Sequence, residues 1–179
     1  MANNYRIFVE KYPEFQVEAA SLKAELNENL QLDLQSLRLL NVYDLFGFTP
    51  ELLEKSRYSV FGEIVTDKVS DECDLTGTRY IAVEYLPGQF DQRAASAVDC
   101  VHLIDPKADV RIKSSKLIIL SGDTDDATIS KIKHYYINAV ESREKDLSKL
   151  TDAESAAVKP VPVLDGFTKM TDADLEPFC

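Results

Sequence analysis

The sequence is poor in the residues on which most catalytic and metal sites depend. Its 179 residues include no tryptophan, two histidines and three cysteines, which are Cys73, Cys100 and Cys179. Cysteines so few and so far apart form neither a disulfide framework nor a CxxC metal knuckle. We therefore expect a protein of a reducing compartment, for which the cytoplasm is the simplest location.

Phosphate-binding loops and membrane-spanning segments are missing as well. The six glycines are dispersed, and neither GxGxxG nor GxxxxGK[ST] occurs. No apolar run approaches the roughly 18 residues that cross a bilayer, and residues 1–6 show no signal-peptide pattern. Because 31 acidic residues outnumber 20 basic ones, for a net charge of −11, we expect neither nucleic acid nor an anionic membrane as partner.

The histidines and cysteines do not suggest a nucleophilic site. His102 lies in an apolar, helix-like stretch and His134 follows a lysine, so both are expected to pack or to face solvent rather than to act as bases. Cys100 directly precedes a position of an apolar helical stripe and is expected to be buried and inert. Cys73 lies in the acidic loop Ser70–Asp74, whose carboxylates are expected to raise the pKa of its thiol.

The acidic residues also fit structural roles better than chemical ones. Asp123, Asp125 and Asp126 lie at a predicted helix start, where carboxylates favour the positive end of the helix dipole, so capping is preferred to calcium binding. Glu10 and Glu84 occupy matching strand positions that face away from the apolar side. We expect them to be solvated or to contact the other repeat. The sequence therefore predicts no catalytic, cofactor-binding or metal-binding residue.

An internal repeat is the main positive feature of the chain. The segment Ile7–Phe15 resembles Ile81–Phe90, at an offset of 74 positions before the shared proline and 75 after it. The second copy thus carries one extra residue, near Gly88. In each copy a strand-like alternation precedes the proline and a helical stripe of apolar residues follows it. These stripes are Phe15, Ala19, Leu22 and Leu26 in the first copy and Phe90, Ala94, Ala97 and Val101 in the second.

Each copy continues with the same succession of predicted elements. Apolar strands are expected at Leu37–Phe46 and Val110–Leu120, and the helices that follow begin at Thr49 and at Thr124. Short extended pieces near residues 63–68 and 139–143 complete the two copies. Each unit is therefore a strand–helix–strand–helix–strand arrangement.

One such unit would expose an apolar face, whereas two units in one chain can bury their faces together, as a symmetric dimer does. We predict an α+β fold, built as a two-layer α/β arrangement, in which the tandem repeats form a pseudo-dimer with helices packed on antiparallel-type sheets. The pattern leaves open whether the two sheets face each other or join into one.

The composition changes near residue 145. We assign residues 1–145 to one domain, with repeats at about 5–68 and 79–143, and residues 146–179 to a linker and the start of a further domain. Thr171 and Asp174 have the spacing of a capping box, so a helix begins shortly before Cys179. We therefore expect the natural chain to continue.

The segment Leu86–Arg93 has the densest set of polar residues and allows two interpretations. It is either a tight turn, with Asp91 at a helix N-terminus and Phe90 in the core, or a docking surface for another domain. The candidate docking residues are Gln89, Asp91, Gln92 and Arg93.

Five segments of the chain, in order, resemble the N-terminal domain of large-type phosphoribosylformylglycinamidine synthases. They are Tyr5–Lys11, Asn41–Asp44, Ala82–Ser96, Asn138–Arg143 and Val161–Phe167. In that family the front domain is similar to a fused dimer of a small S-type subunit, in agreement with the repeat. The whole enzyme converts formylglycinamide ribonucleotide, glutamine and ATP to formylglycinamidine ribonucleotide, glutamate, ADP and phosphate in purine biosynthesis.

The resemblance implies that the chemistry lies downstream. The linker, the synthetase domain with its ATP and Mg²⁺ sites, and the glutaminase domain with its Cys–His–Glu triad would all follow this segment. No catalytic residue is carried over, and Cys179 is not taken for the glutaminase nucleophile. This segment alone is therefore expected to be inactive and to need no cofactor.

The favoured hypothesis is a scaffolding domain that docks the synthetase and glutaminase domains of the same polypeptide and supports ammonia transfer. The alternative is a free-standing regulatory domain that binds a small metabolite where the repeats meet. With its docking surface exposed, the isolated domain is also a candidate for self-association.

Overall fold

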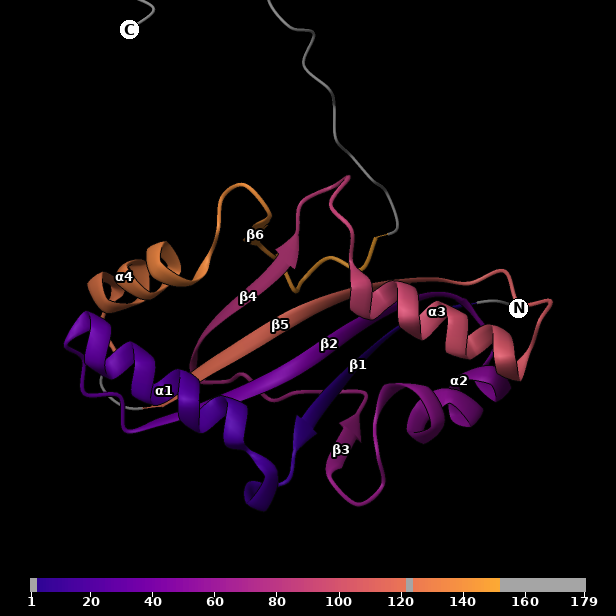
Figure 1. Ribbon diagram of the computed structural model, residues 1–179, viewed down its shortest axis with the longest axis horizontal. Helices are drawn as coiled ribbons and strands as arrows, with labels where there is room; N and C mark the ends of the chain where they lie inside the picture. Colours follow the sequence, from indigo (N-terminus) through magenta and orange to yellow (C-terminus); the bar gives the residue numbers. More distant parts are fainter. Residues whose placement is uncertain (1–2, 122–123, 152–179) are drawn as a thin grey trace, which may run out of the picture.

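The computed structural model describes residues 3–121 and 124–151 as an α+β fold of two layers, with a six-stranded antiparallel sheet and four α-helices (Figure 1). The first half contains β1 (Asn3–Lys11), α1 (Val17–Leu30), β2 (Ser36–Phe48), α2 (Pro50–Ser56) and β3 (Asp67–Ser70). The second contains β4 (Arg79–Tyr85), α3 (Gln92–Ile104), β5 (Arg111–Ser121), α4 (Asp126–Tyr136) and β6 (Ser142–Glu144). Short helical turns follow β1 at Pro13–Phe15 and α2 at Arg57–Phe61.

The sheet is continuous across the two halves. Its strand order is β3-β1-β2-β5-β4-β6, and each neighbouring pair is antiparallel. The central strands β2 and β5 pair without a break from Ser36↔Ser121 to Phe46↔Arg111. The two halves therefore join edge to edge, which answers the question that the sequence pattern left open.

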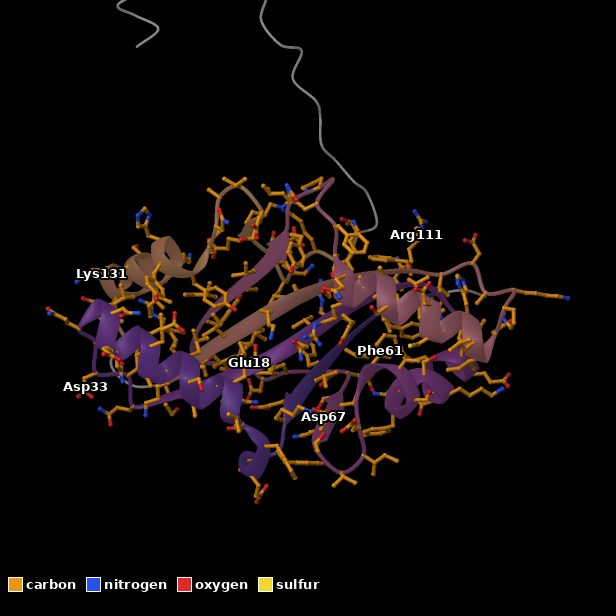
Figure 2. The ribbon with its side chains drawn as sticks, viewed as in Figure 1. Glu18, Asp33, Phe61, Asp67, Arg111 and Lys131 are labelled. Atoms are coloured by element: carbon orange, nitrogen blue, oxygen red, sulfur yellow. The ribbon has the colours of Figure 1, made fainter. Side chains whose placement is uncertain are left out.

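All four helices cover the same face of the sheet. Helices α1 and α4 lie over one end, and α2 and α3 lie over the other (Figure 1). Ile7 and Val9 of β1, together with Ile81 and Val83 of β4, turn their side chains to this face because alternate strand residues share one side. Charged helix residues such as Lys131 point away into solvent (Figure 2).

The predicted helical stripes are confirmed except at their first residues. The buried residues of α1 are Ala19, Leu22 and Leu26, and those of α3 are Ala94, Ala97 and Val101. Phe15 and Phe90, however, are 43% and 75% exposed. Both precede the helix proper, Phe15 in a short 3₁₀ turn and Phe90 before the cap of α3, so the helical period does not reach them.

The prediction that Cys100 is buried is wrong. Cys100 is exposed on α3, whereas the next residue, Val101, is completely buried. With 3.6 residues per turn, one step along a helix rotates a side chain by about 100°. A residue that directly precedes a stripe position therefore lies well outside a narrow stripe.

The helix-free face of the sheet has an apolar centre of its own. Its buried residues are Phe8, Leu40, Val42, Ala82, Leu117 and Ile119. The connector between the halves, residues 71–78, packs Cys73 and Leu75 against this cluster, and Leu147 packs there as well. Both faces are thus covered, one by helices and one by irregular chain.

The predicted cap at Thr49 is confirmed, and α4 begins within the predicted stretch Thr124–Ala127 with Asp125 rather than Thr124 as its cap, whereas the third strand of each half begins later than expected. The Thr49 hydroxyl accepts from the Leu52 N–H at 3.2 Å, and the Asp125 carboxylate accepts from the Thr128 N–H at 2.7 Å. Strands β3 and β6 begin at residues 67 and 142 rather than near 63 and 139. The reason is a turn before each strand, closed by N–H···O bonds from Asp67 to Glu63 (2.8 Å) and from Ser142 to Asn138 (2.7 Å).

The predictions for Thr171, Asp174 and Cys179 lie outside the described residues, so the boundary at residue 145 stays a prediction. Asp123 lies outside them as well. Of the helices in the described ranges, none is long and apolar enough to cross a membrane.

Candidate docking site

The turn between β4 and α3 depends on a glycine. Strand β4 ends at Tyr85, and the Gln89 N–H donates to the Leu86 carbonyl at 3.0 Å to close the turn. Gly88 has φ +88°, in the left-handed region that residues with a Cβ adopt only at a cost. The extra residue predicted near Gly88 thus lies in a turn whose left-handed position is a glycine, so the turn carries little backbone strain.

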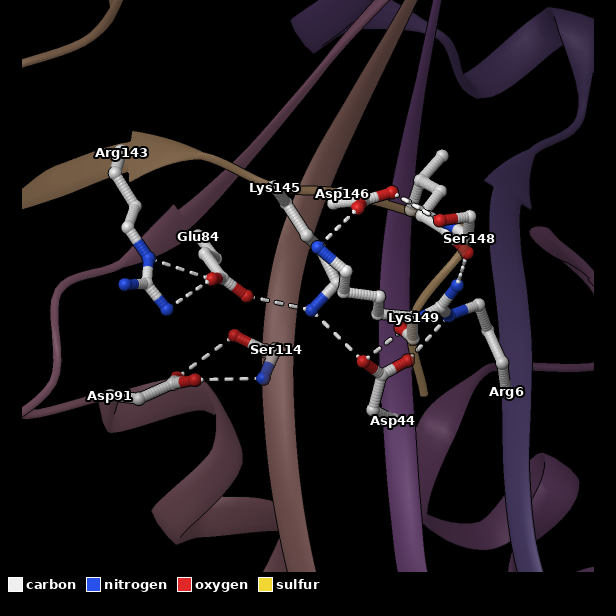
Figure 3. A network of polar contacts seen from close by, with 11 residues as sticks. Arg6, Asp44, Glu84, Asp91, Ser114, Arg143, Lys145, Asp146, Ser148 and Lys149 are labelled. Atoms are coloured by element: carbon white, nitrogen blue, oxygen red, sulfur yellow. Dashed lines mark hydrogen bonds and ion pairs between the residues drawn. The ribbon is translucent and has the colours of Figure 1, made fainter. Parts of the chain in front are cut away.

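Asp91 ties this turn to both helix α3 and strand β5. Its Oδ1 accepts from the Ala94 N–H at 2.9 Å, which caps α3. The Ser114 N–H donates to Oδ2 at 2.8 Å, and the Ser114 hydroxyl donates to Oδ1 at 2.9 Å (Figure 3). The turn interpretation is therefore right about Asp91 and wrong about Phe90, which is exposed.

The other three candidate residues are exposed and point in different directions. The Gln89 side chain donates to the Val140 carbonyl at 3.2 Å, and Gln92 stays exposed. Arg93 reaches the Tyr43 hydroxyl at 3.5 Å. Burial works to lower the pKa of Arg93, but the Tyr43 contact and nearby carboxylates outweigh it and the pKa is raised. Arg93 therefore stays a cation.

A network of charges on the helix-free face lies next to this turn. The Lys145 ammonium is 2.9 Å from Asp44 of β2 and 2.8 Å from Glu84 of β4, and the Lys145 side chain is only 5% exposed (Figure 3). The Arg6 guanidinium donates to Asp44 at 2.9 Å, and Arg143 donates to Glu84 at 2.9 Å. Three cations thus surround two carboxylates over the central strands.

The sequence pattern predicts the position of only some residues of this network. Strand alternation places Arg6, Asp44 and Glu84 on the helix-free face, but no periodic pattern assigns a position to Lys145. Arg6 also donates to the carbonyl of Lys149 at 2.7 Å and to that of Leu147. The network therefore holds the chain that leaves β6 against the sheet.

Glu10 and Glu84 were expected either to be solvated or to contact the other repeat, and neither contacts the other half of the sheet. Glu10 accepts from Arg38 of the neighbouring strand at 2.7 and 2.6 Å, and Glu84 binds Arg143 and Lys145 of its own half. Each glutamate faces away from the helices, so it pairs with the nearest cation beside it on the sheet. The salt bridges printed between the two halves instead join Lys145 to Asp44 at 2.9 Å and Lys116 to Glu18 at 2.6 Å.

The cysteines and histidines among the described residues are Cys73, Cys100, His102 and His134, and their surroundings do not suggest a reactive group. Burial is the main reason that the pKa of Cys73 is raised, and the carboxylates of Glu10 and Asp74 add to it. The expected direction is thus confirmed, although burial contributes more than the acidic loop. His102 and His134 are both exposed. Within residues 3–121 and 124–151, no three His, Cys, Asp or Glu side chains are grouped so as to hold a metal ion.

A cavity of about 910 Å³ lies between the turn, α3, the start of β5 and the chain after β6. Ala95 and Val98 of α3 line it on the helix side of the sheet. Arg143, Lys145 and Lys149 line it on the other side. The cavity therefore extends around the edge of the sheet, and its lining includes Gln89 and Asp91 of the predicted docking surface.

Comparison with known proteins identifies no matching family model, no matching curated protein and no matching solved structure. Any functional conclusion consequently depends on the residues and geometry described above.

Proposed function

We propose that this chain is the non-catalytic N-terminal scaffolding domain of a phosphoribosylformylglycinamidine synthase, the glutamine- and ATP-dependent amidotransferase of purine biosynthesis. The observation that carries the proposal is the run Ala82–Ser96, which resembles that family most closely. It folds as the end of β4, a glycine turn and the capped start of α3, and it leaves Gln92 and Arg93 exposed. A segment whose polar residues are neither buried nor clustered around a reactive group suits docking.

We also infer that the two halves are tandem repeats that form a pseudo-dimer. The strand order reads the same from either end, as β3-β1-β2 and as β6-β4-β5. Matching backbone bonds recur at the repeat offset: the Tyr12 N–H donates to Thr66 at 2.9 Å, and the Leu86 N–H donates to Glu141 at 2.8 Å. These correspondences support an origin as two copies of one unit.

In this proposal the domain positions the synthetase and glutaminase domains of the same polypeptide and supports ammonia transfer between them. ATP and Mg²⁺ would be bound by the later domains. The alternative of a metabolite sensor at the junction of the repeats receives less support, because β2 and β5 occupy that junction with an unbroken ladder.

The first test is the coding sequence beyond residue 179, which must encode synthetase and glutaminase domains. The second is the double substitution Gln92→Ala/Arg93→Ala in the intact polypeptide. Because both side chains are exposed, we expect the free energy of unfolding to change by no more than about 0.5 kcal/mol. Glutamine-dependent synthesis should fall, while synthesis from added ammonia should be retained.

The matched control is Asp33→Ala/Lys131→Ala, which removes two exposed charges at the α1–α4 end of the molecule (Figure 2). It should leave both activities unchanged. Normal glutamine-dependent activity in the Gln92/Arg93 variant rejects the docking role. Turnover by the isolated 179-residue chain rejects the assignment as non-catalytic.

A further inference from the structure

Strand β5 extends beyond its neighbour β4 and leaves a short part of its edge without a partner strand. The ladder with β4 ends at Ser115 of β5, whereas β5 begins at Arg111. The Ser114 N–H is already engaged, because it donates to Asp91 at 2.8 Å. The open part of the edge is therefore short, and Ile112 lies at its centre.

The peptide group of Ile112 faces this open edge. Alternate residues of a strand direct their N–H and C=O to opposite neighbours, and Ser114 directs its own N–H away from β2. Ile112, two residues earlier, therefore faces the same way, into the cavity that it lines. Among the described residues none pairs with the Ile112 peptide group on that side. Ile112 is 8% exposed, and a buried backbone group without a partner is unfavourable.

The small size of this edge decides what kind of occupant suits it. One residue offers two backbone hydrogen bonds, and each of them adds only modestly to stability in water. A separate peptide loses translational and rotational freedom when it binds, and two such bonds do not offset that loss. A segment of the same chain loses far less, because its tether keeps it at a high effective concentration. The edge therefore suits a tethered segment better than a free one.

The described part of the chain ends beside this edge. Thr151 and Ile112 line the same cavity, and the sequence continues from Thr151 to Cys179. The ten residue steps from Thr151 to Val161 reach about 33 Å at most. Val161 and its neighbours are therefore within reach of Ile112.

The residues within reach have the pattern of a strand that can pair on one side only. In the run Val158–Leu164, prolines occupy positions 160 and 162. Because alternate residues of an extended segment direct their N–H groups to opposite sides, both prolines remove donors from the same side. Val161 and Val163 keep their N–H groups on the other side. Prolines within sheets are confined to edge strands and bulges, so this run suits the outermost strand of a sheet.

The cavity also suits the side chains of this run. Opposite residues of an antiparallel pair share one face of the sheet, and Ile112 turns its side chain to the helix side. On that side Ala95 and Val98 line the cavity, and Phe90, which is 75% exposed, lines it as well. A valine opposite Ile112 would cover this apolar surface, which is favourable. No charged side chain is needed for the fit.

We propose that the chain's own segment Val158–Leu164 adds to the open edge of β5 as a further antiparallel strand, with Val161 opposite Ile112. The Val161 N–H donates to the Ile112 carbonyl, and the Ile112 N–H donates to the Val161 carbonyl. The two prolines then face outward and keep other strands from adding to the sheet. Gln92 and Arg93 are not among the residues that line the cavity, so the added strand leaves both docking candidates exposed.

The proposal does not depend on the assignment to a purine-biosynthesis enzyme. It concerns how the chain that leaves this domain is held, which NMR measures without any activity. Loss of glutamine-dependent activity and loss of the added strand are separate results, so either proposal can fail alone.

The test is amide hydrogen exchange in the full 179-residue chain, followed by NMR. We expect the Ile112 amide to exchange at least about tenfold more slowly in the unaltered chain than in Val161→Pro, which lacks the N–H on the pairing side. Cross-strand NOE contacts between Ile112 and Val161 should appear in the unaltered chain. The Ser114 amide, which donates to Asp91, is the internal reference and should exchange at the same rate in both chains.

The matched control is Val158→Pro, which adds a proline on the side of the run that already has two. It should keep both the slow exchange of Ile112 and the NOE contacts. Ala95→Arg tests the location, because it fills the apolar wall that Val161 would cover. It should speed the exchange of the Ile112 amide by about tenfold or more. Thermal unfolding of each variant shows whether the fold is intact.

Several results would overturn the proposal. They are equal exchange of Ile112 in the unaltered chain and in Val161→Pro, an equal loss of protection in Val158→Pro, and the absence of NOE contacts between Ile112 and Val161. Protection that falls when the protein is diluted identifies a second copy as the occupant. Protection that appears only when another protein is added identifies a partner instead. Either outcome replaces the chain's own segment and rejects the proposal.

Discussion

Asp91 shows how one short side chain can join three parts of a fold. Its two oxygens receive the Ala94 N–H, the Ser114 N–H and the Ser114 hydroxyl, so helix start, turn and strand edge are held together. Asp146, which lines the same cavity as Asp91, accepts several hydrogen bonds in a similar manner and so holds the chain that follows β6. The Ser148 hydroxyl and N–H donate to Asp146 Oδ1 at 2.6 and 3.0 Å, and Lys149 lies 2.9 Å from Oδ2.

The pKa of Asp146 is a prediction at this scale. The Ser148 hydroxyl is the main cause that lowers the pKa of Asp146 from 3.8 to about 2, with Lys149 next. Ser148→Ala should therefore raise the pKa of Asp146 toward 3.8, as measured by carboxyl NMR titration. Because the pKa is lowered in the folded state, the contribution of Asp146 to stability is complete above pH 3.8 and is lost as the pH falls through about 2.

Ser130→Ala is the control for this titration, since the Ser130 hydroxyl donates to the Asp126 carbonyl in α4 rather than to a carboxylate. It should leave the pKa of Asp146 unaltered. If Ser148→Ala also leaves it unaltered, the hydroxyl is not the cause.

At the scale of elements, β2 and the loop before β5 approach closely at a glycine. Gly47 has φ +80°, and a Cβ added there would overlap the backbone carbonyl oxygen of Asp109. Gly88 has a similar φ of +88°, but a Cβ there would meet nothing within 4 Å. The two glycines therefore separate backbone strain from steric overlap.

Gly47→Ala should lower the free energy of unfolding by about 2–4 kcal/mol, because strain and overlap act together. Gly88→Ala should cost only about 1 kcal/mol, since strain acts alone. Urea denaturation of both variants measures the difference. Equal losses would mean that the loop before β5 moves aside without cost.

The elements also show how far sequence reasoning reaches. Local periodicity predicted the stripes of α1 and α3, and residue chemistry predicted the caps at Thr49 and Asp125. The exposure of Phe90 depends on the residue at which α3 begins, and cap geometry decides that residue. Cys100 was misplaced because its neighbour in sequence is not its neighbour on the helix surface. The candidate docking residues were identified from their polarity. The cavity beside them and the position of Lys145 could not be predicted, because both depend on where the chain after β6 packs against the sheet.

At the scale of the whole molecule, Lys145 joins the two halves across the sheet. Its partners Asp44 and Glu84 belong to β2 and β4, and strand β5 lies between them. Asp44 is 3% exposed, so a loss of its positive neighbours is not compensated by water. No pattern within one repeat predicts this bridge, because it depends on the register between β2 and β5.

Lys145→Met should lower the free energy of unfolding by about 3 kcal/mol, because Asp44 and Glu84 lose the nearly buried cation that they share and each keeps only an arginine. Lys149→Met is the control: the Lys149 side chain is 72% exposed, and its loss should cost no more than about 0.5 kcal/mol. Adding Glu84→Gln to Lys145→Met should recover part of the loss. Chemical denaturation measures all three, and equal stability of the two lysine variants would contradict a structural role for the network.

The connector at residues 71–78 has a consequence for how the chain assembles. It must pass from β3 to β4, four positions apart in the strand order, or about 19 Å at the usual strand spacing. The nine residue steps from Ser70 to Arg79 reach about 30 Å at most, and part of that length is spent along the strands. With a connector shortened by a few residues, β4 could not reach its position in the sheet, so β5 could not pair with the β2 of the same chain. Two such chains would then exchange halves and pair the β2 of one with the β5 of the other. The length of this crossing therefore sets whether the folded unit is one chain or two.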